Sequence, residues 1–348
     1  MTLLDNQVSG ASISKYTYIY DALGRRHDRT QTGSAVNRAS TDTFSYNGRN
    51  EVAGSLNSVE MAAEWNPTYS YDKIGNRKRS TGITNAIYDA NLLNQYETVT
   101  IDSAASPIYD LDGNLTSDGG NWIYIWNSEN RLVSATDGTR TLNFTYDYQG
   151  RLVRKDDGTD IEIYLYDGWN RIFAISNPEP QIETTKSFLW GLDLSGSFQG
   201  AGGVGGLLKE GDLYPTFDAN GNILQKLNSG GAVVMSVDYD PFGNIIEGML
   251  VGDYGFSTKP LVDDLDWYYY GYRYYDPVTG RWPNRDPIGE MQRSELAKLY
   301  DQLEQKDLTN IQNGFYQCQF TRFFYDILVK LLIYRFLSSN LMVYHRCH

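Results

Sequence analysis

Cysteine is nearly absent from this 348-residue sequence, which contains two, Cys318 and Cys347, both close to its C-terminus. The first 290 residues therefore cannot form a disulfide-stapled scaffold, and cysteine usage carries no information about the cellular compartment. Histidine is also scarce, with three residues, and neither a His-Glu-x-x-His nor a Cys-x-x-Cys pattern occurs. We therefore expect no metal site and no cofactor.

Basic charge is also in short supply. Lysine and arginine total 30 against 43 acidic residues, which gives a net charge of −13. Nucleic acids and anionic membrane surfaces both require clustered basic side chains, so we expect neither as a partner. The apolar run at residues 327–337 is interrupted by Lys330 and Arg335, so no stable membrane span is expected. The first residues lack the basic and apolar regions of a secretory signal.

Helical periodicity is lacking before residue 290, and the composition changes there. Of 33 glycines, only Gly314 lies beyond that point. Apolar residues then recur at helical spacing, at Leu296, Leu299, Tyr300 and Leu303, which predicts an amphipathic helix over about residues 290–310. Residues 291–348 are therefore predicted to be a separate, helical C-terminal tail.

The first 290 residues do contain a repeated turn motif. Its pattern is an aromatic residue, Asp, two variable residues, Gly or Asn, and then Arg or Asn, usually followed by an aliphatic residue. Copies lie at residues 20–25, 71–77, 109–115, 126–132, 146–152, 166–171, 217–223 and 239–245, with weaker copies at 46–49 and 88–91. Self-similarity at a spacing of mostly about 17 to 26 residues indicates a repeat array.

Each copy predicts a β-hairpin. The Asp accepts backbone hydrogen bonds, and the Gly or Asn three residues later takes a positive φ, as a type I turn with a G1 bulge requires. The flanking residues alternate between apolar and polar, as at 16–20 and 142–146, which is typical of half-buried strands. One hairpin is marginal in water, so neighbouring hairpins must stack. The predicted fold class is therefore all-β, a long, curved antiparallel sheet built from these hairpins.

The array ends in an aromatic block, residues 267–289, with Asp-Pro turn signals at 276–280 and 286–289. The block reads Trp-Tyr-Tyr-Tyr-Gly-Tyr-Arg-Tyr-Tyr-Asp-Pro-Val-Thr-Gly-Arg-Trp-Pro-Asn-Arg-Asp-Pro-Ile-Gly. Over about residues 15–290, the repeats and this block resemble the YD repeats and the repeat-associated core of the RHS (rearrangement hotspot) family. The resemblance implies a spiralling β-sheet wound into a hollow shell, as in bacterial toxin-complex cocoons and the teneurin barrel.

The resemblance also implies that three segments of the chain have different roles. Residues 1–266 would form the YD-repeat array, 267–290 the core-associated block, and 291–348 a variable segment that the shell holds and that in this family is often a toxin. The expected partners are the chain's own C-terminal segment, an upstream shell-completing chain and an immunity protein. A secreted or cell-surface location is implied. A complete shell needs more strands than this chain supplies, so we expect an open, partial sheet or a missing N-terminal part.

Two carboxylates in the aromatic block are candidate catalytic residues. In the family the block contributes to an aspartic autoprotease that releases the C-terminal segment, and the resemblance places Asp286 in that role, with Asp276 as a possible partner. An aspartic protease needs two carboxylates about 3 Å apart that share one proton. The alternative is that each Asp only begins a turn. Arg273 and Arg281 either position these carboxylates or stack on neighbouring tyrosines.

The sequence departs from the family pattern after residue 289. Family members continue with an Asn-Leu-Tyr segment and a second Asp-Pro-x-Gly, where cleavage falls. This chain instead reads Met-Gln-Arg-Ser-Glu-Leu-Ala-Lys from Met291. The first hypothesis is therefore a non-enzymatic shell that presents its C-terminal segment, and the autoprocessing peptidase is an alternative.

Two further patterns have weaker functional interpretations. Residues 200–205 match Gly-x-Gly-x-x-Gly, but without a strand–helix frame they indicate a flexible or closely packed loop, not a nucleotide site. The aromatic stripes are able to stack on sugar rings, so a cell-surface adhesion or carbohydrate-binding module is a third hypothesis. Their alternation favours a packed sheet face.

Overall fold

The computed structural model describes residues 2–59, 62–82, 84–177 and 184–286. These residues form strands β1 to β28 and one short 3₁₀ helix, η1 (Phe256–Thr258), and the strand pairs are antiparallel. The all-β prediction is therefore confirmed for this part of the chain. The chain divides into two compact units, Met1–Arg285 and Asp286–His348. The predicted helical tail lies outside the described residues.

Two large sheets account for the first 210 residues, and in both of them chain neighbours are also sheet neighbours, except that β6 pairs with β5 and β5 also pairs with β7. The first sheet comprises β1 (Leu3–Val8), β2 (Ala11–Tyr20), β3 (Arg26–Thr32), β4 (Ser40–Tyr46), β5 (Val52–Val59), β6 (Ala62–Trp65), β7 (Thr68–Tyr71), β8 (Arg77–Thr81), β9 (Ala86–Ala90), β10 (Tyr96–Thr100) and β11 (Ala104–Ala105). The second comprises β12 (Ile108–Tyr109), β13 (Leu115–Ser117), β14 (Ile123–Trp126), β15 (Leu132–Thr136), β16 (Thr141–Tyr146), β17 (Leu152–Asp156), β18 (Ile161–Asp167), β19 (Asn170–Ser176), β20 (Thr184–Trp190) and β21 (Leu207–Glu210). We call these strands the wall.

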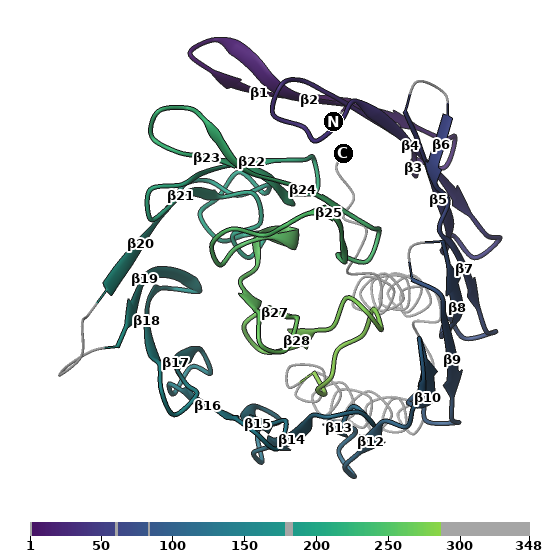
Figure 1. The fold of residues 1–348 in the computed structure, drawn as a ribbon, viewed down its shortest axis with the longest axis vertical. Coiled ribbons are helices and arrows are strands. Elements are labelled where there is room, and N and C mark those ends of the chain that lie inside the picture. The colour runs from purple at the N-terminus through teal and green to yellow at the C-terminus, as the bar shows by residue number, and fades with distance from the viewer. Residues whose placement is uncertain (1, 60–61, 83, 178–183, 287–348) are drawn as a thin grey trace, which may run out of the picture. The chain divides into compact units, whose positions relative to one another are not determined.

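Two small sheets follow. One comprises β22 (Tyr214–Phe217), β23 (Ile223–Leu227), β24 (Val233–Tyr239) and β25 (Ile245–Gly248), and the other β26 (Leu261–Val262), β27 (Trp267–Tyr269) and β28 (Tyr274–Tyr275). We call residues 214–285 the inner segment. Figure 1 shows it, in green, inside the curve that the wall strands make within the first unit.

The turn motif folds as its residues predict. At residues 147–151 the Asp147 carboxylate accepts hydrogen bonds from the backbone N–H of Gln149 (3.0 Å) and Arg151 (2.9 Å). Gly150 has a φ of 86°, and the strand register shifts by one residue beside the turn. Where Asn replaces Gly, as at Asn130, it adopts the same left-handed conformation, with φ 57°. The hairpin closure is therefore set by a few adjacent residues.

Two copies of the motif differ from prediction. At 166–171 the strands continue pairing to Asp167 and Asn170, so a two-residue turn closes the hairpin, because Gly168 takes the positive φ (56°) earlier than the motif requires. At 88–91 Asp89 lies inside strand β9, opposite Thr98. The turn lies instead at 91–95, where Asn91 accepts the backbone hydrogen bonds.

The aromatic residue before a turn has a polar function that the alternation pattern does not reveal. At five turns its hydroxyl or indole N–H donates to a backbone carbonyl of the preceding hairpin, which joins successive repeats. The bonds are Tyr46 to Arg26 (2.7 Å), Tyr71 to Val52 (2.8 Å), Tyr166 to Leu152 (2.7 Å), Trp126 to Leu115 (2.6 Å) and Trp190 to Arg171 (2.7 Å). At these five turns Tyr or Trp supplies a donor that Phe lacks. The copy at 217–223 has Phe217 and cannot form this bond. The hydroxyl of Tyr146 instead bonds that of Tyr274 in the inner segment (2.7 Å).

The apolar core lies between the wall and the inner segment. Buried wall residues such as Tyr16, Leu132 and Phe144 belong to one cluster with Ile223 and Trp267 of the inner segment. Ring pairs join the two parts directly, for example Tyr124 with Trp267, whose centroids are 4.7 Å apart. Many of the wall tyrosines, including Tyr16, Tyr18 and Tyr164, are therefore core residues, as the packed-face interpretation predicts.

Candidate functional site: the inner segment and its docking turns

The inner segment contacts the wall along most of the length of both large sheets. Near the start of the wall, the Tyr16 hydroxyl donates to Gln225 (3.1 Å), and the hydroxyl of Tyr18 accepts from the backbone N–H of Ala219 (2.9 Å). Near its end, Lys186 of β20 lies 2.5 Å from Asp253. The wall therefore holds one continuous segment through contacts between residues far apart in the sequence.

Four turns bind the last part of this segment, and we call them the docking turns. They lie at residues 72–76, 110–114, 218–222 and 240–244, and in each an Asn follows the positive-φ Gly. The side-chain N–H of that Asn donates to the Asp of its own turn, at 2.7 Å for Asn76, 2.9 Å for Asn114, 3.0 Å for Asn222 and 2.8 Å for Asn244. The amide is thus held in one orientation by its own turn.

The same four amides also bind residues between 257 and 285. The Asn76 oxygen accepts from Arg281 (2.5 Å), the Asn114 oxygen from the backbone N–H of Arg285 (3.0 Å) and the Asn222 oxygen from the backbone N–H of Ser257 (2.8 Å). The Asn244 N–H donates to the carbonyl of Pro277 (3.0 Å). The docking turns therefore position the chain that leads to residue 286.

Turns with Arg at the same position make different contacts. Arg25 pairs with Asp21 (2.7 Å) and stacks over Tyr46 of the next repeat, 4.6 Å from its centroid. Arg151 pairs with Asp147 (2.6 Å) and lies 5.3 Å from the centroid of Tyr166. These two arginines therefore link neighbouring wall repeats, whereas the four asparagines each form a bond to residues 257–285, and Asn114 also bonds Asn130 of the neighbouring wall turn (2.8 Å). The choice of Asn or Arg is a sequence signal that the motif carried and that sequence reasoning did not use.

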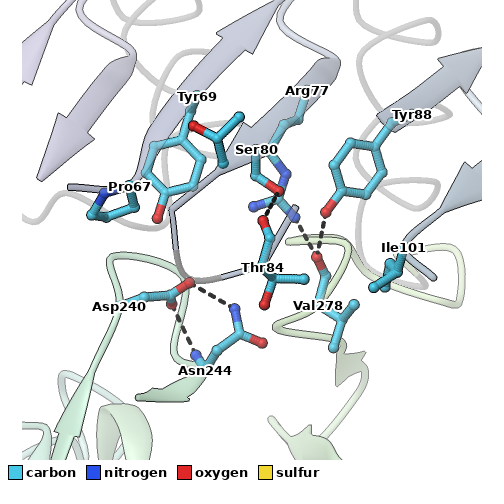
Figure 2. A pocket seen from close by; sticks show the side chains of 11 residues that line it. Pro67, Tyr69, Arg77, Ser80, Thr84, Tyr88, Ile101, Asp240, Asn244 and Val278 are labelled. Atoms are coloured by element: carbon cyan, nitrogen blue, oxygen red, sulfur yellow. Dashed lines mark hydrogen bonds between the residues drawn. The ribbon is translucent and has the colours of Figure 1, made fainter. Parts of the chain in front are cut away.

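Figure 2 shows the docking contacts around Arg77, in a cavity of about 110 Å³. The Arg77 guanidinium donates to the carbonyl of Val278 (2.5 Å), and the Tyr88 hydroxyl donates to the same oxygen (3.0 Å). Arg77 also lies over the ring of Phe242, 4.3 Å from its centroid. Burial disfavours the charge, but the neighbouring Tyr88, Tyr96 and Asp240 raise the pKa of Arg77. This arginine therefore holds the aromatic block as a buried cation.

Two clusters of buried charge add to these contacts, and sequence reasoning missed both. In the first, Arg29 lies 2.6 Å from Asp42 and 3.7 Å from Asp218, while Gln31 donates to Asp238 (3.2 Å). Burial raises the pKa of Asp238, although the Arg29 charge opposes this. No local pattern marks Arg29 or Asp42 as buried, because their cover lies about 190 residues further along the chain.

The second cluster surrounds Lys226, whose side chain and that of its partner Glu210 are both fully buried, with 2.5 Å between Nζ and the carboxylate. Burial lowers the pKa of Lys226 in spite of Glu210. At Asp253 burial tends to raise the pKa of the carboxyl group, but the charges of Lys186 and Arg171 outweigh it and lower the pKa. The cluster joins the last wall strand to the inner segment.

The candidate carboxylates are placed as follows. Asp276 accepts hydrogen bonds within its own turn, from the backbone N–H of Val278 (2.8 Å) and the hydroxyl of Thr279 (2.5 Å), and burial raises its pKa. Asp286 is half-buried and is the first residue of the second compact unit. Their pairing as a catalytic dyad stays a prediction. Arg281 lies over the ring of Tyr96 (3.7 Å), as the stacking interpretation predicts, and Arg273 lies over a tryptophan instead, Trp282 (4.1 Å).

The Gly-rich stretch at 200–205 wraps around a carboxylate of this chain. Asp193 accepts hydrogen bonds from the backbone N–H of Ala201 (2.6 Å) and Gly203 (3.1 Å). Gly203 has a φ of 79°, which favours glycine, and a Cβ there would lie 2.5 Å from the Asn170 side-chain oxygen, which would have to move. Within the described residues, no group of three acidic, His or Cys side chains converges as metal ligands would, and no helix has the length and apolarity of a membrane span.

A curved series of hairpins closed by Asp-Gly turns, packed around an inner segment, is the architecture of a YD-repeat shell. The family model described as "Teneurin YD-shell" matches residues 4–320. The chain belongs to this family.

Three curated proteins are similar over part of their length. "tRNA nuclease WapA" of Bacillus subtilis (strain 168) is 27% identical over 234 residues, which cover 63% of this chain and 9% of the relative. "tRNA3(Ser)-specific nuclease WapA" of Bacillus spizizenii is 26% identical over 235 residues, with the same two shares. "Toxin subunit YenC1" of Yersinia entomophaga is 31% identical over 81 residues, which cover 21% of this chain and 8% of the relative. The chain spans about a tenth of the length of these relatives.

Solved structures of toxin complexes also match. "Crystal Structure of TcdB2-TccC3" aligns with 82% of this chain and 21% of its own, at 14% identity and a TM-score of 0.38. "Structure of Photorhabdus luminescens Tc holotoxin pore, Mutation TccC3-D651A" aligns with 82% of this chain and 20% of its own, also at 14% identity and a TM-score of 0.38.

Proposed function

We propose that this chain is a non-enzymatic shell scaffold of a polymorphic-toxin carrier, which encloses and presents its variable C-terminal segment. The observation that carries the proposal is the set of docking turns. Their four asparagines bind backbone or side-chain atoms between residues 257 and 285, immediately before the tail begins. A rigidly held end is what a scaffold needs to present a variable segment. The curated relatives, two named as nucleases and one as a toxin subunit, support a toxin as the cargo.

Limited trypsin digestion tests whether the body protects the tail. Residues 291–348 contain seven lysines and arginines, so the tail offers trypsin many cleavage sites. In the full chain we expect cleavage at these sites to be at least roughly tenfold slower than in the same tail fused to an unrelated soluble domain, because an enclosed segment must first open locally. Equal cleavage rates in the two proteins would contradict enclosure.

The autoprocessing alternative predicts something else. Wild-type chain would yield a fragment ending near residue 286, and the Asp286→Asn variant would not. We expect no such fragment from either protein, because both Asp276 carboxylate oxygens already accept hydrogen bonds within their own turn. Electrophoresis of freshly purified wild type and Asp286→Asn decides between the two. A fragment from the wild type alone would replace the scaffold proposal with a peptidase.

The proposed partners follow from the scaffold. They are the C-terminal segment itself, a chain that completes the shell and an immunity protein for the cargo. The carbohydrate-binding alternative requires accessible rings, and many of the wall tyrosines pack in the core. Glycan-array binding above that of a tyrosine-poor β-sheet control would favour this alternative.

A further inference from the structure

A second, larger cavity of about 220 Å³ lies between the tip of the β18–β19 hairpin and two loops of the inner segment. Seven aromatic side chains line it, among them Trp169, Trp190 and Tyr270. Trp169 is 37% exposed and packs on Tyr272, with 4.6 Å between centroids, so this part of the lining borders solvent. An apolar cavity of roughly 150 Å³ is large enough for benzene. The present cavity therefore has room for one ring and a small substituent.

The polar ends of the lining side chains point to protein partners. The Tyr166 hydroxyl donates to the carbonyl of Leu152 (2.7 Å), the Trp190 indole N–H donates to the carbonyl of Arg171 (2.7 Å), and the Tyr269 hydroxyl accepts from the backbone N–H of Leu152 (2.8 Å). The ring carbons of these residues are left to line the cavity. Such a surface favours a flat apolar ring, through edge and face contacts.

Among the residues that the structure describes, one cation of the lining, Lys259, forms no ion pair with a carboxylate. Arg171 is already engaged, 3.5 Å from Asp253 and 3.6 Å from the centroid of Tyr164. The Lys259 ammonium donates to the carbonyl of Gly202 (2.6 Å) and lies 5.5 Å from the Tyr270 centroid, and no ion pair joins it to another described residue. Asp193 acts on it from a distance, but that carboxylate accepts bonds from Ser195, Ala201 and Gly203. An ammonium has three donors, so Lys259 retains capacity for an anion.

We propose that this cavity binds a small aromatic carboxylate, with the ring against the aromatic lining and the carboxylate paired to Lys259. Burial lowers the pKa of Lys259 to about 8, although the charge of Asp193 opposes this. A bound anion would restore the charged form, so binding is strongest below pH 8 and weakens as Lys259 loses its proton above it. Burial raises the pKa of the lining residues Tyr166, Tyr254, Tyr269 and Tyr270, so they remain uncharged over this range. The pKa of Arg171 is also raised, by the neighbouring Tyr166, Tyr254, Tyr164 and Asp253 against the effect of burial, so it keeps its charge.

The test compares three ligands that share one ring and differ in charge. Isothermal titration of the full chain at pH 7 with benzoate, benzyl alcohol and benzylamine should give saturable binding of benzoate. Its affinity should be at least roughly tenfold above that of benzyl alcohol, which corresponds to about 1.4 kcal/mol, with benzylamine weakest. Equal affinities for benzoate and benzyl alcohol, or binding of glucose without binding of benzoate, would overturn the proposal.

Two lysine variants test whether Lys259 supplies the positive charge that binds the carboxylate of the ligand. Lys259→Met keeps the apolar stem and should reduce benzoate affinity to that of benzyl alcohol. Lys209→Met is the matched control, because Lys209 also lies over a tyrosine, 5.6 Å from the Tyr214 centroid, but outside the cavity. Benzoate affinity should be unchanged in this control. If Lys259→Met does not fold, as judged by circular dichroism, the wild-type pH profile decides, and benzoate affinity that is flat between pH 6.5 and pH 9.5 would overturn the assignment.

Discussion

The same turn motif occurs in the wall and in the inner segment, but its carboxylate meets opposite environments in the two places. At Asp147 of the wall, burial tends to raise the pKa of the carboxyl group. Hydrogen bonds from its own turn and the charge of Arg151 outweigh burial and lower the pKa. In Asp240 of the inner segment burial dominates and raises the pKa, although Asn244 and two backbone N–H groups hydrogen-bond the carboxylate. The motif thus fixes the hydrogen bonds of a turn, while packing decides the charge state that the protein favours.

This difference shows how one repeat serves two purposes. A wall turn with Arg pairs its Asp with a cation and leaves the turn partly in water, so the contribution of the charge to stability is small. The Asn turns of the inner segment, at 218–222 and 240–244, bury the carboxylates of Asp218 and Asp240, and each also uses its neutral amide to bind a more distant segment. Substitutions in the buried Asn turns should therefore lower the free energy of unfolding more than the same substitutions in the wall turns with Arg.

The largest expected effect is loss of the buried pair between the wall and the inner segment. Lys226→Met should lower the free energy of unfolding by about 3–5 kcal/mol, because it removes the cation 2.5 Å from the buried Glu210 carboxylate and leaves only Lys186, 3.9 Å away. Urea denaturation measures the change. The control is Lys209→Met, whose partner Asp212 is almost fully exposed, and its effect should be within about 0.5 kcal/mol. Similar losses of stability in Lys226→Met and Lys209→Met would contradict the proposed difference between the buried and the exposed ion pair.

The docking asparagines should come next. Asn114→Ala removes bonds to Asp110, Asn130 and Arg285 at a buried position, and we expect a loss of about 2–3 kcal/mol in the same assay. Arg151→Ala, at the equivalent position of a wall turn, should cost about 1 kcal/mol or less, because its ion pair is partly exposed. A larger loss of stability in Arg151→Ala than in Asn114→Ala would contradict the proposal that the Asn turns contribute more to stability than the Arg turns.

A smaller effect is expected for the bond between neighbouring repeats. Tyr166→Phe keeps the ring and removes the hydroxyl that donates to Leu152, so the free energy of unfolding should fall by about 1 kcal/mol. Tyr148→Phe is the matched control, since Tyr148 is 91% exposed. A thermal melt of each variant measures the difference. No shift in Tyr166→Phe relative to this control would show that the hydroxyl does not stabilise the array.

The smallest effect is a local response to acid that differs between the two regions. As the pH falls below the ordinary pKa of 3.8, the stabilisation that lowers the pKa of Asp21, Asp72 and Asp147 declines, and it is lost completely below their lowered pKa, so the amides of these turns should exchange faster. Asp238 and Asp240, whose pKa is raised, favour the protonated form in the fold, so their contribution to stability grows as pH falls. Hydrogen exchange at pH 3 and pH 6, corrected for intrinsic rates, measures both responses. An equal loss of amide protection from exchange in the wall turns and in the inner segment would contradict the proposed difference in their response to acid.

Most of the fold could be predicted because its rules are local. The Asp, Gly and aromatic residues of one copy lie within six residues, and they define the turn, the bulge and which strand face is buried. The two copies that differed did so for equally local reasons, a glycine one residue after the Asp at 167–168 and an asparagine pair at 91–94. The catalytic pairing of Asp286 with Asp276 stays a prediction, because the distance between two turns does not follow from either turn alone.

The sequence by itself determined the hairpins, the all-β class and the family, because turn geometry and period-two burial depend on adjacent residues. Only the tertiary structure decided which turns are covered, why Arg29 and Lys226 are buried charges and that Lys259 borders an aromatic cavity. These properties depend on segments that meet from distant parts of the chain, as Tyr16 meets Gln225 across 209 positions. Burial, and with it the charge state and binding capacity of a side chain, is set by what packs over that side chain.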